Sequence, residues 1–185
     1  MSRSSSEPVK HLVVHVGKVS LLPAVVALAL TTSAGSAQEP NALSETYGVW
    51  AVQCKTANAP EGDETIRTCQ VSQELRQADT QQRVISAVFT ANPDKLTLIT
   101  PFGLQLGEGV RFSTGNGELP VGWFSTCLQT VGCVADIAPD ADGMENLQSS
   151  QTLTVLMTSI NGQTLRADLS LNGFKDAVKR LRVLQ

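Results

Sequence analysis

The sequence predicts an all-β protein, mainly antiparallel, that forms a β-sandwich with a C-terminal amphipathic helix. Three observations lead to this fold class. Short segments that alternate apolar and polar residues are separated by turn-rich segments along most of the chain. Helical segments do not alternate with these strands, so a parallel α/β sheet is disfavoured. Only the final segment has helical periodicity. A partly closed barrel is the second architecture that fits this pattern.

The first part of the chain has the organisation of a secretory signal peptide. Three cations and one acid precede an uncharged, mostly apolar run at 19–30, and a small-residue segment with Gly35 and Ala37 follows. The apolar run is too short for a membrane-spanning helix, which needs about 20 residues. We therefore expect residues 1–37 to be cleaved after Ala37. Residues 38–185 then form a single domain that is periplasmic or secreted.

The composition of the remaining domain excludes several function classes. Without the leader it contains 11 basic and 16 acidic residues, a net charge of −5, so it lacks the basic face that nucleic-acid binding requires. Both histidines, His11 and His15, lie in the leader. A histidine-free domain excludes Ser-His-Asp and Cys-His nucleophiles and histidine-ligated zinc or haem. We predict no catalytic residues, no metal site and no cofactor, and hence a non-enzymatic protein.

Four cysteines, Cys54, Cys69, Cys127 and Cys133, lie in the exported part of the chain. An even number of cysteines behind a signal peptide indicates disulfides. Three connectivities are possible, and we expect the sequential pairing because it closes two short local loops. Neither spacing is the C-x-x-C of redox proteins or zinc knuckles, so structural bridges are favoured over thiol exchange or a metal site.

The strands and the final helix are predicted from periodicity and turn residues. About eight short strands are expected, at 47–54, 66–75, 84–89, 95–100, 119–127, 133–137, 153–159 and 163–171. A type I′ hairpin turn is predicted at Asn161-Gly162. In the last segment Phe174, Ala177, Val178 and Leu181 share one helix face, and Asn172 is the expected N-cap. We expect this helix to cover the sandwich, and docking on a partner is the alternative.

Two regions are candidates for a binding function. The loop at 101–110 contains one proline and three glycines, which predicts a bulge with close backbone approach or a ligand-binding rim, with Pro101, Phe102 and Gly103 as its candidate residues. Trp123 and Phe124 are neighbours on a predicted strand, so their rings face opposite sides. An outward ring could cap a loop or anchor a partner.

The acidic segment at 136–145 is the candidate for a cation site. Asp136, Asp140, Asp142 and Glu145 surround a glycine, which is similar to a calcium-binding loop. In the register of that loop, Ala138 and Ser149 would occupy the two end-ligand positions, and neither carries a carboxylate. The sequence therefore favours a solvated acidic loop or a short helix over a calcium site.

The cysteine-containing segments and two further motifs resemble the invasion-associated locus B family. The segments at 47–54 and 69–75 are similar to the start of that family. The proline-glycine loop at 101–110, the second cysteine pair at 127–133 and the Gly-Phe helix start at 171–178 follow in the family's order. Together these five segments extend the resemblance over most of the exported domain.

The resemblance implies a bacterial periplasmic or secreted protein with an immunoglobulin-like β-sandwich, and no catalytic residues come with it. Some relatives are linked to entry into host cells. We therefore predict an envelope protein that binds an unknown protein or envelope partner. A periplasmic small-molecule binding module and a hydrolase that uses carboxylates alone are the alternatives. A large apolar pocket would favour the first, and a pair of facing acids would favour the second.

Overall fold

The structure, a computed structural model, describes residues 42–59 and 64–185. The predicted leader and its cleavage site lie outside these residues. Within the described part of the chain, neither helix combines the length and the apolar composition that a membrane-crossing helix requires.

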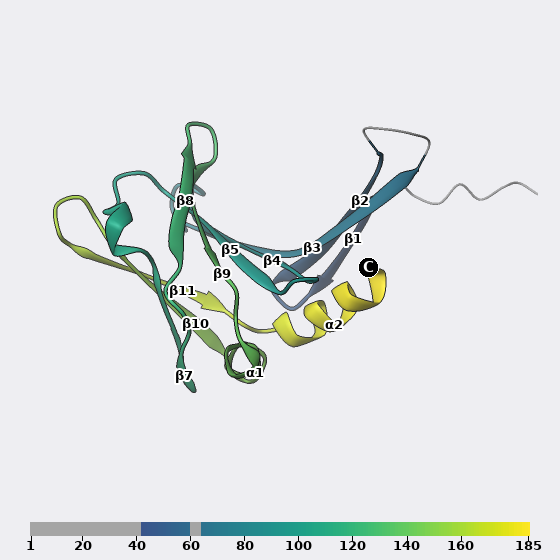
Figure 1. Cartoon of the computed structure of the whole chain (residues 1–185). Helices are drawn as coiled ribbons and strands as arrows, with labels where there is room; N and C mark the ends of the chain where they lie inside the picture. Colours follow the sequence, from purple (N-terminus) through teal and green to yellow (C-terminus); the bar gives the residue numbers. More distant parts are fainter. Residues whose placement is uncertain (1–41, 60–63) are drawn as a thin grey trace, which may run out of the picture. The chain divides into compact units, whose positions relative to one another are not determined.

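The described residues form eleven strands, two α-helices and one short 3-10 helix, shown in Figure 1. In chain order these elements are β1 (Ala42–Tyr47), β2 (Trp50–Asn58), β3 (Thr65–Arg76), β4 (Arg83–Thr90), β5 (Lys95–Thr100), η1 (Leu106–Glu108), β6 (Arg111–Thr114), β7 (Gly117–Glu118), β8 (Trp123–Leu128), β9 (Gly132–Ile137), α1 (Ala141–Ser149), β10 (Thr152–Thr158), β11 (Thr164–Ser170) and α2 (Phe174–Leu184). The predicted antiparallel β-sandwich with a C-terminal helix is confirmed.

A seven-stranded sheet forms the first layer of the sandwich, in the order β1-β2-β3-β4-β5-β9-β8. All of its pairings are antiparallel, and the first five strands follow one another as in the sequence. Because successive side chains alternate between the two faces, one face carries the buried residues of each strand. Val52, Phe89, Leu98 and Ala135 are four of these fully buried residues.

The small sheet and helix α2 together cover this buried face. A four-stranded sheet, β11-β10-β6-β7, lies over one part, where Phe112 of β6 and Ile137 of β9 both adjoin Gly122. Helix α2 packs on β1, β2 and β3. Both covers contribute to a single hydrophobic core. The seven-stranded sheet is therefore covered partly by strands and partly by the C-terminal helix.

Helix α2 is anchored by aromatic packing at its first turn. The Phe174 ring centroid lies 4.9 Å from that of Trp50 and 5.5 Å from that of Phe89. The Trp50 indole N–H donates to the Ser170 carbonyl at 2.9 Å, which ties β2 to β11. The predicted apolar face of the helix is buried in full. The helix therefore belongs to the core, as the sequence predicted.

One predicted strand, 47–54, is in fact two elements joined by a turn. β1 ends at Tyr47 and β2 begins at Trp50, and these two residues pair across a two-residue turn. Gly48 has φ of +57°, which the first central position of a type II′ turn requires. Alternation of apolar and polar residues continues through this turn, so the pattern did not reveal it. Gly48 is the residue that could have indicated the turn. Similarly, the predicted strand at 119–127 begins only at Trp123.

The hairpin at Asn161-Gly162 is present, but its predicted turn type was wrong. Gly162 has φ of +80°, whereas Asn161 is not among the described non-glycine residues with positive φ. The Gly162 N–H donates to the Ser159 carbonyl, and the Ser159 N–H donates to the Gln163 carbonyl. These bonds define a three-residue loop with glycine in the left-handed position, the second common way to close a hairpin.

The predicted N-cap of the last helix was also wrong. The N-cap is Gly173, with φ of +87° and no side-chain hydrogen bond, one residue after Asn172. A Cβ on Gly173 would lie 2.0 Å from the Tyr47 carbonyl oxygen. The Asn172 carbonyl instead accepts a bond from the Val49 N–H. Close packing between the β1–β2 turn and the start of the helix therefore requires a glycine at the N-cap.

Candidate functional site

The loop at 101–110 is held to two other segments by main-chain hydrogen bonds. Gln105 N–H donates to the Thr158 carbonyl at 2.8 Å, and Ile160 N–H donates to the Gly103 carbonyl at 2.9 Å. Val110 and Gly122 exchange two bonds of 2.8 Å each. The segments 101–110, 120–123 and 158–160 therefore adjoin one another, near the 3-10 helix at the left of Figure 1.

The predicted close backbone approach occurs at Gly109. A Cβ there would lie 2.8 Å from the Gly122 carbonyl oxygen, 2.9 Å from Val121 Cγ1 and 3.3 Å from Trp123 Cε3. The side chains of Val121 and Trp123 thus lie directly against the Gly109 backbone. The structure brings the loop that contains Pro101, Phe102 and Gly103 to the start of the strand that contains Trp123.

Trp123 and Phe124 lie on opposite faces of β8. Trp123 pairs with Asp136 and is 60% exposed on the outer face of the large sheet. Phe124 pairs with Ala135, which is buried, and packs against the core. Phe124 is therefore partly buried against the core, and Trp123 is the more exposed residue of the pair.

Sequence reasoning missed three exposed apolar residues on the same segments: Leu106, Val121 and Ile160. Ile160, which is 74% exposed, occupies the first loop position of the β10–β11 hairpin. An aliphatic residue beside Asn-Gly in a turn was the signal that could have identified it. We call the five exposed residues Phe102, Leu106, Val121, Trp123 and Ile160 the apolar loop cluster.

A small open groove of about 210 Å³ lies beside this cluster. Phe102 lines it together with Pro101, Val84 and Val131. The guanidinium of Arg83 donates to the Val131 carbonyl at the tip of the β8–β9 hairpin. Thr100, Gln129 and Thr130 also line this groove, so its surface is mixed apolar and polar with one cation.

The four cysteines form the sequential disulfides. Cys54 and Cys69 lie directly opposite each other on β2 and β3, and both are 98% buried. Cys127 and Cys133 lie opposite each other on β8 and β9, with Cys127 exposed. Each bridge connects two neighbouring strands of the large sheet.

The acidic segment does not converge on one point. Asp136 lies on β9, where its carboxylate accepts a 2.5 Å bond from the Thr97 hydroxyl. The Asp140 carboxylate caps α1 by accepting a 2.8 Å bond from Gly143 N–H. Within the described residues, no three histidine, cysteine or acidic side chains are grouped closely enough to hold a metal ion. The short-helix alternative of the sequence prediction is the one observed.

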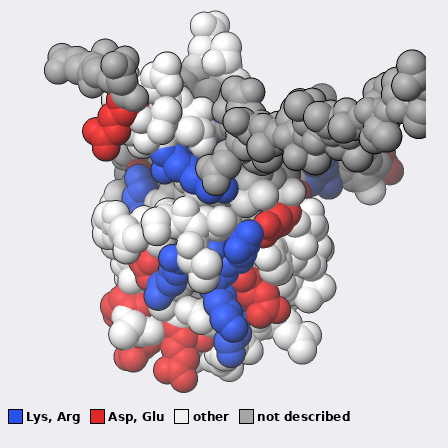
Figure 2. Space-filling view, turned by 90° about the vertical axis from the view of Figure 1, so that its right-hand side faces the viewer, with Lys and Arg blue, Asp and Glu red and all other residues white. Residues whose placement is uncertain are grey.

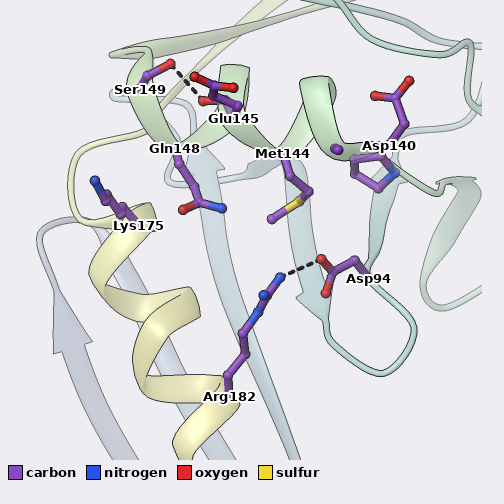
Figure 3. A pocket seen from close by; sticks show the side chains of 10 residues that line it. Asp94, Asp140, Met144, Glu145, Gln148, Ser149, Lys175 and Arg182 are labelled. Carbon is purple, nitrogen blue, oxygen red and sulfur yellow. Dashed lines mark hydrogen bonds and ion pairs between the residues drawn. The ribbon is translucent and has the colours of Figure 1, made fainter.

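An open groove of about 520 Å³ is lined by residues of both α1 and α2 (Figure 3). Asp94, Asp140 and Glu145 line it together with Met144. Asp94 accepts a 2.6 Å bond from Arg182, and Asp140 is the cap of α1, so two of the three acids are already engaged. Asp94 and Asp140 therefore have structural partners in this groove, and Lys175 and Arg182 line it as well.

A charged cluster connects α2 to β1. Arg180 donates two 2.7 Å bonds to the Glu45 carboxylate, and the Tyr47 hydroxyl donates to it at 2.9 Å. The hydrogen bond from Arg180 is the main reason that the pKa of Glu45 lies below its ordinary value of 4.5. Arg166 lowers the pKa of Asp168 in the same way. A general acid instead needs a raised carboxyl pKa, so this shift suits a structural ion pair.

Most of the chain matches one known protein family. The family model described as invasion associated locus B (IalB) protein matches residues 50–182. An invasion protein B homolog of Brucella abortus is 34% identical over 147 residues, which cover 77% of this chain and 80% of the relative. Invasion protein B of Bartonella bacilliformis is 28% identical over 154 residues, which cover 78% and 77% respectively.

A solved structure is also similar to this chain. The crystal structure of invasion associated protein b from Bartonella henselae superposes with a TM-score of 0.65 at 25% sequence identity. The superposition covers 77% of this chain and 97% of that protein.

Proposed function

This chain belongs to the invasion-associated locus B family, and from this premise we propose that it is an exported, non-enzymatic module that binds another protein of the cell envelope. The apolar loop cluster is the proposed contact surface. Removal of residues 1–37 would deliver the domain to the periplasm or the exterior. The two disulfides support this location, because disulfides persist in oxidising compartments.

The apolar loop cluster is the observation that carries this proposal. Five large apolar side chains are exposed on three adjoining segments, and main-chain hydrogen bonds hold those segments in place. Exposed apolar patches with polar margins are typical of protein interaction sites. Tryptophan and phenylalanine are enriched at the centres of such interfaces. A scaffold fixed by strands also lowers the entropy cost of binding.

Site-specific photocrosslinking in the native host tests the proposal. A photoreactive amino acid replaces Trp123 or Phe102 in separate strains, and covalent adducts are identified by mass spectrometry. We expect both positions to capture the same envelope protein, because both lie on the same adjoining segments. The replacement of Gln151 is the matched control, because this exposed polar residue precedes β10, at the opposite end from Ile160.

Capture of one protein at Trp123 and Phe102 but not at Gln151 supports the proposal. Equal capture at all three positions, or none at any of them, contradicts it. The N-terminus of the same purified material is sequenced in parallel. A chain that begins at Gln38 supports export by cleavage after Ala37, and a retained Met1 contradicts it.

A further inference from the structure

Three Asn-Gly pairs occur in the chain, and all of them lie within the described residues. They are Asn116-Gly117, Asn161-Gly162 and Asn172-Gly173. In such a pair the main-chain nitrogen of the glycine can attack the side-chain amide of the asparagine, because glycine has no side chain to obstruct the approach and adopts unusual φ and ψ values readily. The three pairs are chemically equal in the unfolded chain, so the fold decides which of them reacts.

Packing restrains two of the three glycines. A Cβ built on Gly173 would lie 2.0 Å from the Tyr47 carbonyl oxygen, and a Cβ on Gly117 would lie 3.1 Å from Asn146 Nδ2. The asparagine before Gly117 is also held, since its amide nitrogen donates at 2.9 Å to the last residue of α1. Movement of either glycine toward its asparagine would therefore disturb packed neighbours.

The third glycine, Gly162, has no such restraint. A Cβ built there would have no atom within 4 Å apart from its chain neighbours, and Asn161 and Gly162 are both exposed. The loop is closed by the 2.9 Å bond from the Gly162 N–H to the Ser159 carbonyl. Exposed loop tips open locally at a low cost in free energy. The Gly162 nitrogen can therefore reach the Asn161 side chain by a local movement.

A buried hydroxyl lies against the amide that would be attacked. Ser159 is only 8% exposed, and its hydroxyl donates to Asn161 Oδ1. The Gln163 N–H donates to the same hydroxyl oxygen at 3.0 Å. The Gln163 carbonyl is a second acceptor at 3.1 Å, but it already accepts the Ser159 N–H. The hydroxyl proton is therefore available to Asn161 Oδ1, the atom on which negative charge develops during attack at Cγ.

We propose that Asn161 is a site of spontaneous covalent modification, at which the Gly162 nitrogen closes a succinimide ring with the Asn161 side chain. A bond forms between that nitrogen and Asn161 Cγ, the Cγ–Nδ2 bond breaks, and the proton of the Gly162 N–H leaves with the amide group as ammonia. The Ser159 hydroxyl stabilises the developing oxyanion. Water then adds to either ring carbonyl, and the ring opens to aspartate or isoaspartate. No oxidant or reductant takes part.

Either product places a carboxylate in a hairpin loop that has no charge of its own. Residues 158–163 include no acidic or basic residue, and Ile160 of the apolar loop cluster directly precedes Asn161. Figure 2 shows that basic and acidic side chains are intermixed on the side of the domain that carries α2, whereas the β10–β11 hairpin extends to the left in Figure 1. A new charge beside an apolar contact surface opposes its burial by a partner. The modification would thus weaken partner binding as the protein ages, a consequence that rests on the proposed function.

Peptide mapping by mass spectrometry tests the site. The purified oxidised domain is incubated at neutral pH beside a sample unfolded in urea, and deamidation of Asn116, Asn161 and Asn172 is followed with time. In the folded domain we expect Asn161 to react at least about tenfold faster than the other two, and in urea we expect the three rates to agree within about threefold. An Asn161 that stays intact in the folded domain, or that reacts no faster than the other two, overturns the proposal.

Ser159→Ala separates activation of the amide from opening of the loop. A hydroxyl that only holds the loop closed predicts faster deamidation of Asn161 in this variant, because a restraint is lost. Activation by the hydroxyl predicts a rate at least about threefold slower. Asn116 is the internal control, and its unchanged rate shows that the fold is intact. A faster rate at Asn161 overturns the function assigned to Ser159.

Photocrosslinking at Trp123 measures the consequence for binding. We expect Asn161→Asp to lower capture of the envelope protein at least about fivefold, and Asn161→Gln, which keeps the amide, to lower it less than about twofold. Equal capture by the two variants overturns the effect on binding. Absence of capture in the parent domain contradicts the proposed function instead, and the deamidation rates still decide whether Asn161 is the modification site.

Discussion

At the scale of single residues, glycines decide how closely the segments of the apolar loop cluster approach one another. Gly109 combines φ of +65° with a backbone that touches Gly122 and the side chains of Val121 and Trp123. Gly107, two residues earlier, has no atom within 4 Å of a built Cβ. The two glycines of this loop therefore allow a comparison between a position where close packing requires glycine and a position where it does not.

Gly109→Ala should destabilise the domain by about 2–3 kcal/mol, because it adds left-handed strain and a steric clash. Gly107→Ala should change stability by less than about 0.5 kcal/mol. Urea unfolding monitored by tryptophan fluorescence measures both. Equal midpoints for the two variants would contradict the close approach at Gly109.

Residue-scale features divide into those that the sequence reveals and those that need the fold. Cysteine spacing predicted the pairing of both disulfides, and alternation predicted that Trp123 and Phe124 face opposite sides, although not which of them points outward. Local patterns could not reveal that the Asn172 carbonyl contacts Val49, because that contact joins residues 123 positions apart. The turn at Gly48 was missed for a different reason, since alternation continues through it. Ile160 was missed because exposure in a loop has no periodicity.

At the scale of elements, one ion pair connects the last helix to the first strand. Arg180 and Glu45 form a bidentate pair at 2.7 Å, and both side chains are partly exposed. The pKa of Glu45 is lowered, so its carboxylate favours the folded state. This contribution is complete above the unfolded pKa of Glu45 and is lost as pH falls through its lower folded pKa.

Glu45→Gln should therefore be less stable than the parent domain at pH 7, and the difference should shrink below about pH 4. Urea unfolding at a series of pH values measures this difference. Glu118→Gln, at an exposed glutamate on β7, is the control and should show no such pH-dependent difference. A constant difference for Glu45→Gln across the series would show that the pair does not act through its charge.

Element boundaries were predictable where periodicity and turn residues agreed. The helix face of α2 and the strand at 95–100 match the sequence prediction because burial imposed a regular pattern on them. The sequence could not predict which part of the large sheet is covered by α2 and which by the small sheet, because either could have covered β1 to β3. The apolar loop cluster likewise depends on three loops that the sequence does not connect.

At the scale of the whole domain, the two disulfides act on one sheet but in different surroundings. The Cys54–Cys69 bridge lies in the core under α2, and the Cys127–Cys133 bridge lies at the exposed edge strand β8. Their sequence separations are 15 and 6 residues. Chain entropy in the unfolded state then gives about 3 and 2 kcal/mol.

Reduction of both bridges should lower the Tm by on the order of 10 °C, since 1 kcal/mol corresponds to about 2–4 °C in a domain of this size. The paired variants Cys54→Ala with Cys69→Ala and Cys127→Ala with Cys133→Ala separate the two contributions. The first pair should lose more, because it opens the longer loop and also removes buried sulfur atoms from the core. Calorimetry of the parent domain and the two paired variants, with and without reductant, measures these losses. An unchanged Tm in strong reductant would mean that packing alone holds the sheet. A larger loss for the Cys127 and Cys133 variant would mean that the edge hairpin, rather than the core bridge, limits the stability of the domain.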